Sequence, residues 1–108
     1  MRKRTKVLQI PRKVKAAVAA RDSFGDNPFE VSPCCVLCGT TDALPEAHYI
    51  ARSSGGLGVE ENIVTLCRDC HRRMDQTWER ETLRCQVREY LQSKYPNWNE
   101  SDLIYRRD

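Results

Sequence analysis

The chain has 108 residues, a length typical of one domain, and its 40% hydrophobic and 31% charged residues favour a folded protein over a disordered one. No apolar run is long enough to cross a membrane, and no signal peptide is visible, so we expect a cytoplasmic protein. The net charge of +3 is uneven: residues 1–21 hold eight basic and no acidic residues, whereas the remainder holds ten basic and fifteen acidic ones. This asymmetry favours a nucleic acid partner, with a solubilising tail as the alternative.

In chain order, residues 1–10 are predicted to form a basic N-terminal arm, and residues 11–108 a single domain. A helix is expected from Pro11, because apolar residues recur there at helical spacing. Residues 23–33 are expected to be loop, residues 46–51 and 63–67 strands, and residues 68–78 a short helix. An amphipathic helix over about 79–94 carries an apolar stripe of Leu83, Val87, Tyr90 and Leu91. The order of elements predicts an α+β domain, and Trp98, Leu103, Ile104 and Tyr105 are expected to fold back onto its core.

Four of the six cysteines form two pairs with a two-residue gap, and 28 residues separate the pairs. Disulfides are not expected in a reducing cytosol, and this gap lets two sulfurs reach one ion. Four thiolates favour zinc in a closed tetrahedral site, which has a structural role. We therefore predict a structural zinc ion held by Cys35, Cys38, Cys67 and Cys70.

The other two cysteines have weaker roles. Cys34 is an alternative to Cys35, although three residues separate it from Cys38. Cys85 lies in the predicted amphipathic helix and is expected to be a small core residue. Redox or simply buried cysteines are the alternative for the whole set, but they do not account for two close pairs.

The two histidines, His48 and His71, are not needed for a zinc site that already has four thiolates. His71 directly follows Cys70, so the zinc knuckle would fix where its helix begins. Asp75 lies four residues further on, on the same helical face, and imidazole with carboxylate can ligate a divalent ion. Taken singly, either histidine could instead be a buried structural residue.

The ordered set of a CxxC pair, His48, Gly55-Gly56, Asn62 and a second CxxC pair followed by His71 resembles the HNH endonucleases. That family has the ββα-metal (His-Me finger) fold, and the resemblance is strong over about residues 35–75. The stretch "YLQSKYPNWN" is also similar to small phage and prophage members. The resemblance implies one HNH nuclease domain over residues 11–108, with its core at 34–76 and helices on either side.

The resemblance also implies the chemistry. His48 matches the general base that activates water, Asn62 a residue that braces the hairpin loop, His71 a ligand of the catalytic divalent ion, and Asp75 a further ligand. A neutral imidazole, with an ordinary pKa of about 6.5, suits proton abstraction near neutral pH. The implied cofactor is Mg²⁺ or Mn²⁺, the substrate is double-stranded DNA, and the products carry 5′-phosphate and 3′-hydroxyl ends.

One position departs from the family pattern. The residue before the general base is often a metal ligand, but here it is Ala47. Glu46 should point the opposite way from position 47, because side chains alternate along a strand. The ion would then rest on His71, Asp75, waters and the DNA phosphate, as suits an ion that keeps several waters.

Basic residues beside the predicted site are expected to contact DNA phosphates, with solvated surface charge as the alternative: Arg52, Arg68, Arg72 and Arg73. Two other functions remain open. A non-catalytic zinc-stapled DNA-binding module would account for Ala47, and a zinc-stabilised protein-interaction domain would account for buried histidines. Monomer and dimer are both compatible with the sequence.

Overall fold

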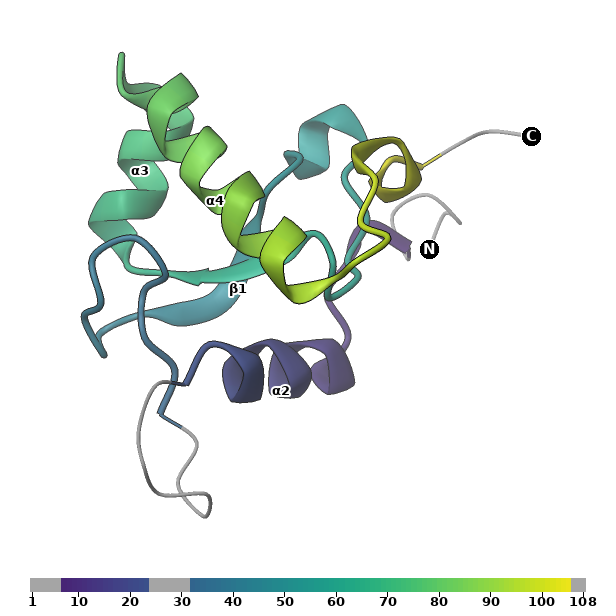
Figure 1. The fold of residues 1–108 in the computed structure, drawn as a ribbon, viewed down its shortest axis with the longest axis horizontal. Helices are drawn as coiled ribbons and strands as arrows, with labels where there is room; N and C mark the ends of the chain where they lie inside the picture. Colours follow the sequence, from purple (N-terminus) through teal and green to yellow (C-terminus); the bar gives the residue numbers. More distant parts are fainter. Residues whose placement is uncertain (1–6, 24–31, 106–108) are drawn as a thin grey trace.

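The computed structural model describes residues 7–23 and 32–105, which form a small α+β fold. A two-stranded antiparallel hairpin lies at its centre, made of β1 (Leu44–His48) and β2 (Ile63–Leu66). Helix α2 (Arg12–Arg21) lies against one side of this hairpin. Helix α4 (Arg80–Lys94) lies on the other side, next to α3 (Arg68–Gln76), as Figure 1 shows. The predicted helices and strands are therefore confirmed in order and type.

Strand β2 is buried at every position, because helices cover both sides of the hairpin. Apolar side chains from β2, α3 and α4 make one core. The predicted stripe of α4 supplies Leu83, Val87 and Leu91, each at most 7% exposed, while Tyr90 is partly buried against them. The β-branched run of β2 therefore suits a strand between two layers.

Strand β1 contains an irregularity that sets which side chains face outward. Leu44 pairs with Leu66, but Ala47 pairs with Val64, so the register shifts by one residue in between. Pro45 lies within this shift and has no N–H for the ladder, which is why prolines in strands occur at bulges and edges. Beyond the bulge, Ala47 faces the core and Glu46 faces outward.

A buried ion pair joins α2 to the rest of the fold. The guanidinium of Arg21 donates to both carboxylate oxygens of Asp22, at 2.8 and 3.1 Å, and to the carbonyl of Ile63 at 2.6 Å. Asp22 is fully buried and also accepts hydrogen bonds from the Thr65 N–H, at 2.9 Å, and from the Tyr90 hydroxyl. One carboxylate therefore connects α2, β2 and α4, and no sequence pattern predicted it.

Both ends of the described chain pack on the glycine-rich loop between the strands. At the C-terminal end, Gly56 and Ile104 form an isolated bridge and the Tyr105 N–H donates to the Gly55 carbonyl at 2.7 Å. The segment thus folds back as expected, with Leu103 3% exposed in the core and Ile104 38% exposed.

At the N-terminal end, part of the predicted arm packs onto the body. Leu8 is 2% exposed, and the Val7 carbonyl accepts a hydrogen bond from the Gly58 N–H at 3.1 Å. Residues 1–6 of that arm, and most of the predicted loop at 23–33, lie outside the described residues.

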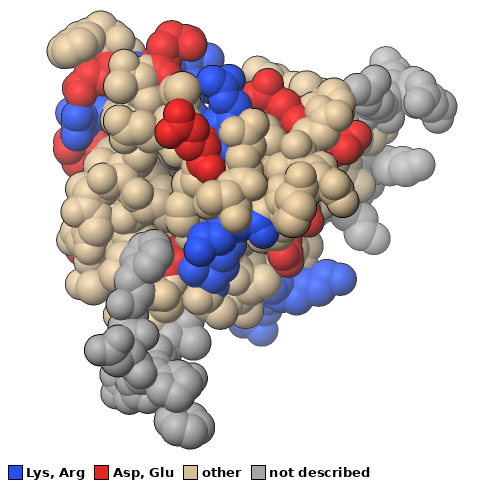
Figure 2. All heavy atoms as spheres, in the orientation of Figure 1, with Lys and Arg blue, Asp and Glu red and all other residues tan. Residues whose placement is uncertain are grey.

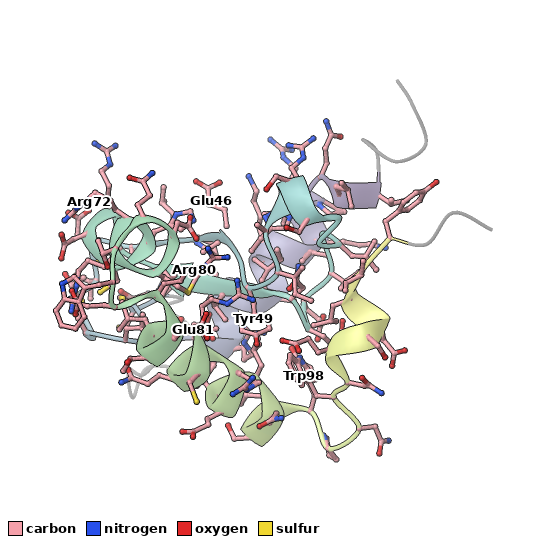
Figure 3. The ribbon with its side chains drawn as sticks, turned by 90° about the horizontal axis from the view of Figure 1, so that it is seen from above. Glu46, Tyr49, Arg72, Arg80, Glu81 and Trp98 are labelled. Atoms are coloured by element: carbon pink, nitrogen blue, oxygen red, sulfur yellow. The ribbon has the colours of Figure 1, made fainter. Side chains whose placement is uncertain are left out.

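The surface differs between faces. Over the face on which α4 lies, Figure 2 shows acidic and basic side chains interspersed. On the opposite face, Glu46 from β1 and Arg72 from α3 point the same way, as seen in Figure 3. Within residues 7–23 and 32–105, no helix has the length and apolar character needed to span a membrane.

Candidate active site and metal centre

The four cysteines predicted to bind zinc meet at one point. The sulfurs of Cys35, Cys38, Cys67 and Cys70 all lie within 4.8 Å of one another, and those of Cys38 and Cys67 are 3.7 Å apart. Four ligands at 2.3 Å in a tetrahedron would have sulfurs about 3.8 Å apart. The cluster therefore fits a single tetrahedral metal ion.

Two tight turns of the backbone bring these thiols together. In the first, the Gly39 N–H donates to the Cys35 carbonyl at 2.8 Å, and Gly39 takes a φ of +81°, which favours glycine. In the second, Cys67 is the N-cap of α3 and its sulfur accepts from the Cys70 N–H at 3.4 Å. The second knuckle therefore fixes the start of α3 and, with it, His71.

Burial raises the pKa of the Cys35 thiol, but hydrogen bonds from the backbone N–H groups of Cys67, Cys38 and Leu37 outweigh it, and the pKa falls to about 7. Backbone donors of this kind stabilise thiolates, the form that binds metal. Cys34 lies outside the cluster, which supports Cys35 as the ligand of the first knuckle. Cys85 is only partly buried in α4 and contacts the Arg88 guanidinium at 3.4 Å.

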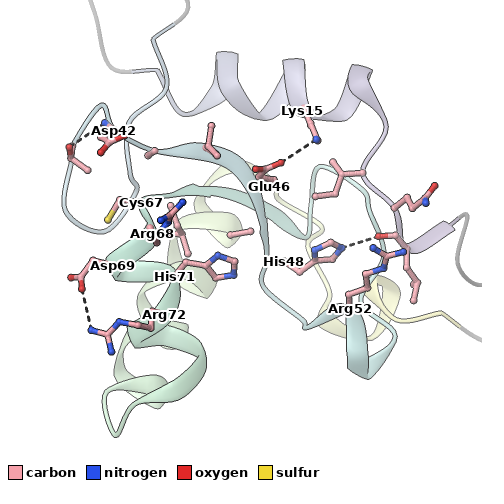
Figure 4. A pocket seen from close by; sticks show the side chains of 18 residues that line it. Lys15, Asp42, Glu46, His48, Arg52, Cys67, Arg68, Asp69, His71 and Arg72 are labelled. Carbon is pink, nitrogen blue, oxygen red and sulfur yellow. Dashed lines mark hydrogen bonds and ion pairs between the residues drawn. The ribbon is translucent and has the colours of Figure 1, made fainter.

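Both histidines line one open cavity of about 1400 Å³ beside the cysteine cluster. In Figure 4, His71 extends from α3 toward β1, and His48 extends from the end of β1 toward the N-terminal segment. Arg52, Arg68 and Arg72 also line this cavity. It thus combines imidazoles with guanidinium groups, which suits a substrate that carries phosphate.

His48 is held by a residue far from it in the sequence. Its Nε2 lies 3.0 Å from the Leu8 carbonyl oxygen. A carbonyl can only accept, so Nε2 carries the hydrogen and Nδ1 of the neutral ring keeps a free lone pair. Burial lowers the pKa of His48 below 6.5; the Leu8 hydrogen bond raises it, and the charges of Arg52 and His71 lower it further. The ring is therefore neutral at pH 7 and has one nitrogen free to accept a proton.

His71 is paired with Asp75 one helical turn later. Its Nε2 lies 3.1 Å from the Asp75 carboxylate, and both side chains are nearly half exposed. Imidazole and carboxylate are both possible metal ligands, but only His71 of this pair lines the cavity. Within residues 7–23 and 32–105, only the cysteine cluster brings three or more potential metal ligands together.

Asn62 is fully buried and connects the two ends of the loop between the strands. Its Oδ1 accepts the Ile50 N–H at 2.8 Å, and its Nδ2 donates to the carbonyls of Ile50 at 3.3 Å and Leu57 at 2.9 Å. Its own carbonyl accepts the Tyr49 N–H at 2.8 Å, one residue beyond His48. Asn62 thereby fixes the chain just after His48 and lies outside the cavity.

Position 47 offers no ligand to this cavity. The Ala47 side chain is 2% exposed and packs in the core cluster. Glu46 and His48 lie on the other side of the strand, and the Glu46 carboxylate pairs with Lys15 of α2 at 3.1 Å. Glu46 does point the opposite way from position 47, as alternation predicts, but the expectation that this takes its carboxylate away from the site is wrong, because Glu46 lines the cavity.

The four arginines predicted to contact DNA divide into two groups. Arg52, Arg68 and Arg72 line the cavity. Arg73 is not among the lining residues, and its guanidinium donates to both carboxylate oxygens of Glu79. Arg72 also pairs with Asp69 at 3.3 Å, but that contact is exposed on both sides.

Two contacts of cavity residues had no signal in the sequence. The Leu8 carbonyl that holds His48 belongs to the backbone, so no residue type at position 8 announces it. The second contact is the ion pair of Lys15 with Glu46. The basic residues of the Lys15 helix predicted only a general attraction for polyanions, not this pair.

Comparison with known proteins agrees with this geometry. The model of the HNH endonuclease family matches residues 35–76, the segment that holds both knuckles, both strands and α3. No curated protein and no solved structure shows significant similarity to the chain. The family match therefore identifies the segment 35–76 as similar to an HNH endonuclease domain.

Proposed function

We propose that the protein is a metal-dependent HNH endonuclease that hydrolyses phosphodiester bonds of double-stranded DNA, with a ββα-metal core made of β1, β2 and α3. The observation that carries this proposal is the shared cavity of His48 and His71 beside three arginines, within the segment that matches the family. A base, a metal-binding histidine and phosphate-binding cations are the groups that this hydrolysis needs.

In the proposed reaction, a water oxygen attacks phosphorus in line with the bond to the 3′ oxygen. His48 Nδ1 accepts the proton of that water as the new P–O bond forms and the P–O3′ bond breaks. The leaving 3′ oxygen takes a proton from solvent water and His48 returns its proton to solvent, which leaves 5′-phosphate and 3′-hydroxyl ends. Arg52, Arg68 and Arg72 bind the flanking phosphates. Mg²⁺ or Mn²⁺ held by His71 and Asp75 would supply positive charge to the phosphate and the leaving oxygen.

The cysteine cluster has a supporting role in this proposal. Four thiolates in a closed site favour Zn²⁺ and leave no open position for substrate. Because Cys67 and Cys70 begin α3, a zinc ion there would fix the position of His71 relative to β1.

The test is plasmid cleavage with added Mg²⁺ or Mn²⁺, comparing the wild-type protein with His48→Ala. Loss of the general base should lower the rate by about 10²- to 10⁴-fold, while zinc content and the circular dichroism spectrum stay unchanged. His48→Ala cutting as fast as the wild type would show that His48 is not the base.

A second function is favoured by Ala47, whose buried methyl group cannot ligate the catalytic ion. A non-catalytic DNA-binding module would bind DNA in a salt-sensitive way and cut under no divalent ion. The same assay, run across Mg²⁺, Mn²⁺, Ni²⁺ and Zn²⁺, separates the two functions.

A further inference from the structure

The N-terminal segment, residues 7–10, lies against the edge of the cavity. Leu8 anchors it, with only 2% of its surface exposed. Leu8, Gln9 and Ile10 all line the cavity that His48 and His71 share. The segment is therefore in contact with the site, although about forty residues separate it from His48 in the sequence.

The segment packs against the backbone of Gly58. The Gly58 N–H donates to the Val7 carbonyl at 3.1 Å. A Cβ atom at position 58 would lie 1.9 Å from the Gln9 carbonyl oxygen and 2.6 Å from its carbonyl carbon. Both of these atoms are backbone, so no side-chain rotation could relieve the clash. The backbone of the segment can thus approach the loop only because residue 58 is glycine.

The docked segment presents the Leu8 carbonyl to His48. The distance of 3.0 Å to Nε2 is that of an ordinary hydrogen bond, and His48 is partly buried. The partner of a histidine nitrogen decides which tautomer the ring adopts and how the ring is turned. Moving the segment would release both constraints together.

We propose that the N-terminal segment is part of the active site, and that Leu8 is a positioning residue whose carbonyl orients His48 while Gly58 holds the segment in place. This inference rests on the proposed function, since it assigns the task of the segment to the proposed base. It also goes beyond that function, because it makes hydrolysis depend on residues outside the HNH segment 35–76.

Simple packing is the competing explanation for the buried Leu8. Under that explanation, removing Leu8 would lower stability and leave the properties of folded His48 unchanged. Leu83 provides the matched control, since it is a leucine of similar burial, 7% exposed, on the core side of α4. Leu83→Ala should lower the melting temperature but leave the cleavage rate of the folded protein unchanged.

The test compares Gly58→Ala, Leu8→Ala, Leu8→Met and Leu83→Ala with the wild type, at a temperature where all are folded. The first readout is the ¹⁵N NMR signal of the His48 imidazole, one of two histidine signals in the chain. We expect a protonated Nε2 and a bare Nδ1 in the wild type, Leu8→Met and Leu83→Ala. Gly58→Ala and Leu8→Ala should give averaged signals of both tautomers.

The second readout is the steady-state rate of duplex DNA cleavage, measured over a range of DNA concentrations so that kcat and KM are separated. Gly58→Ala and Leu8→Ala should lower kcat about tenfold or more with little change in KM, because a misplaced base affects the chemical step more than binding. Leu8→Met, which keeps an apolar side chain at this position, should cleave at the wild-type rate. An unchanged tautomer in Gly58→Ala, or a loss confined to KM, would overturn the proposal. The NMR readout does not depend on cleavage. A wild type that fails to cut would therefore count against the proposed function, while the tautomer of His48 would still test whether the segment positions the ring.

Discussion

Asn62 and Ile50 exchange two hydrogen bonds, from the Ile50 N–H to Oδ1 at 2.8 Å and from Nδ2 to the Ile50 carbonyl at 3.3 Å. The pair closes the loop that leaves β1 and enters β2, and it lies two residues beyond His48. Because Gly56 lies against the same carbonyl, where a Cβ would come within 1.7 Å of the oxygen, the loop has no room to move inward.

Asn62→Ala should therefore destabilise the fold. It removes three side-chain hydrogen bonds and leaves the Ile50 N–H and Leu57 carbonyl without that partner, a loss of about 2–4 kcal/mol in the free energy of unfolding. Urea denaturation measures this loss. Asn97→Ala, at an exposed position near the end of α4, is the control and should change stability by less than about 0.5 kcal/mol. Equal effects of the two substitutions would contradict the bracing role of Asn62.

The neighbouring cysteines 34 and 35 allow a sharp test of the metal centre. Cys35→Ser should reduce bound zinc well below one equivalent and lower the melting temperature by more than about 10 °C, because a structural metal contributes several kcal/mol to folding. Cys34→Ser should leave both quantities as in the wild type, since Cys34 lies outside the cluster. Elemental analysis after dialysis gives the zinc content, and less than half an equivalent in the wild type would contradict a structural zinc site.

The pH dependence of cleavage should reflect the lowered pKa of His48. The base is active when neutral, so the rate should stay level above about pH 6.5 and fall only at lower pH, as His48 gains a proton. Because the charge of Arg52 helps to lower this pKa, Arg52→Gln should move the acid limb to higher pH. Single-turnover rates across this pH range measure both effects, and an acid limb that stays in place in Arg52→Gln would exclude the electrostatic coupling.

The neighbouring residues Arg72 and Arg73 provide a test of DNA binding. Arg72 lines the cavity, whereas Arg73 is engaged by Glu79, so Arg72→Gln should weaken DNA binding more than Arg73→Gln. Loss of one phosphate contact should also reduce the dependence of log K on log salt concentration by about 0.9. Fluorescence anisotropy at several salt concentrations provides these values; a larger effect of Arg73→Gln would place the DNA on the other side of α3.

The buried pair of Arg21 and Asp22 should contribute far more to stability than the exposed pair of Lys15 and Glu46. Asp22→Ala leaves a guanidinium that is 10% exposed without its carboxylate, which should cost about 3–5 kcal/mol. Glu46→Gln breaks an ion pair that is over 40% exposed on both sides, and should cost about 1 kcal/mol or less. Thermal and urea unfolding measure both, and similar losses would mean that the buried network is not needed for the fold.

The sequence was sufficient to predict the parts of this protein that local spacing determines. Two CxxC pairs predicted the four-sulfur cluster, and the stripe of α4 predicted Leu83, Val87 and Leu91 in the core. Alternation along β1 predicted that Glu46 and position 47 point opposite ways. These patterns work because ligand geometry and helical or strand periodicity act over a few residues.

The contacts that the sequence did not predict join distant segments. The Asp22 carboxylate contacts Tyr90, and the Leu8 carbonyl contacts His48, across long stretches of chain. Nothing in the residues around Asp22 distinguishes it from an exposed aspartate in a turn, and a backbone carbonyl has no residue type. The arm predicted over residues 1–10 was assigned from its charge, which says nothing about the apolar anchor at Leu8.

The glycine-rich loop receives both ends of the described chain, Leu8 and its neighbours at Gly58 and Tyr105 at Gly55. A substitution that loosens either contact would therefore act on the same loop. Only the N-terminal contact also reaches His48, through the Leu8 carbonyl, so the two contacts are not equivalent for the site.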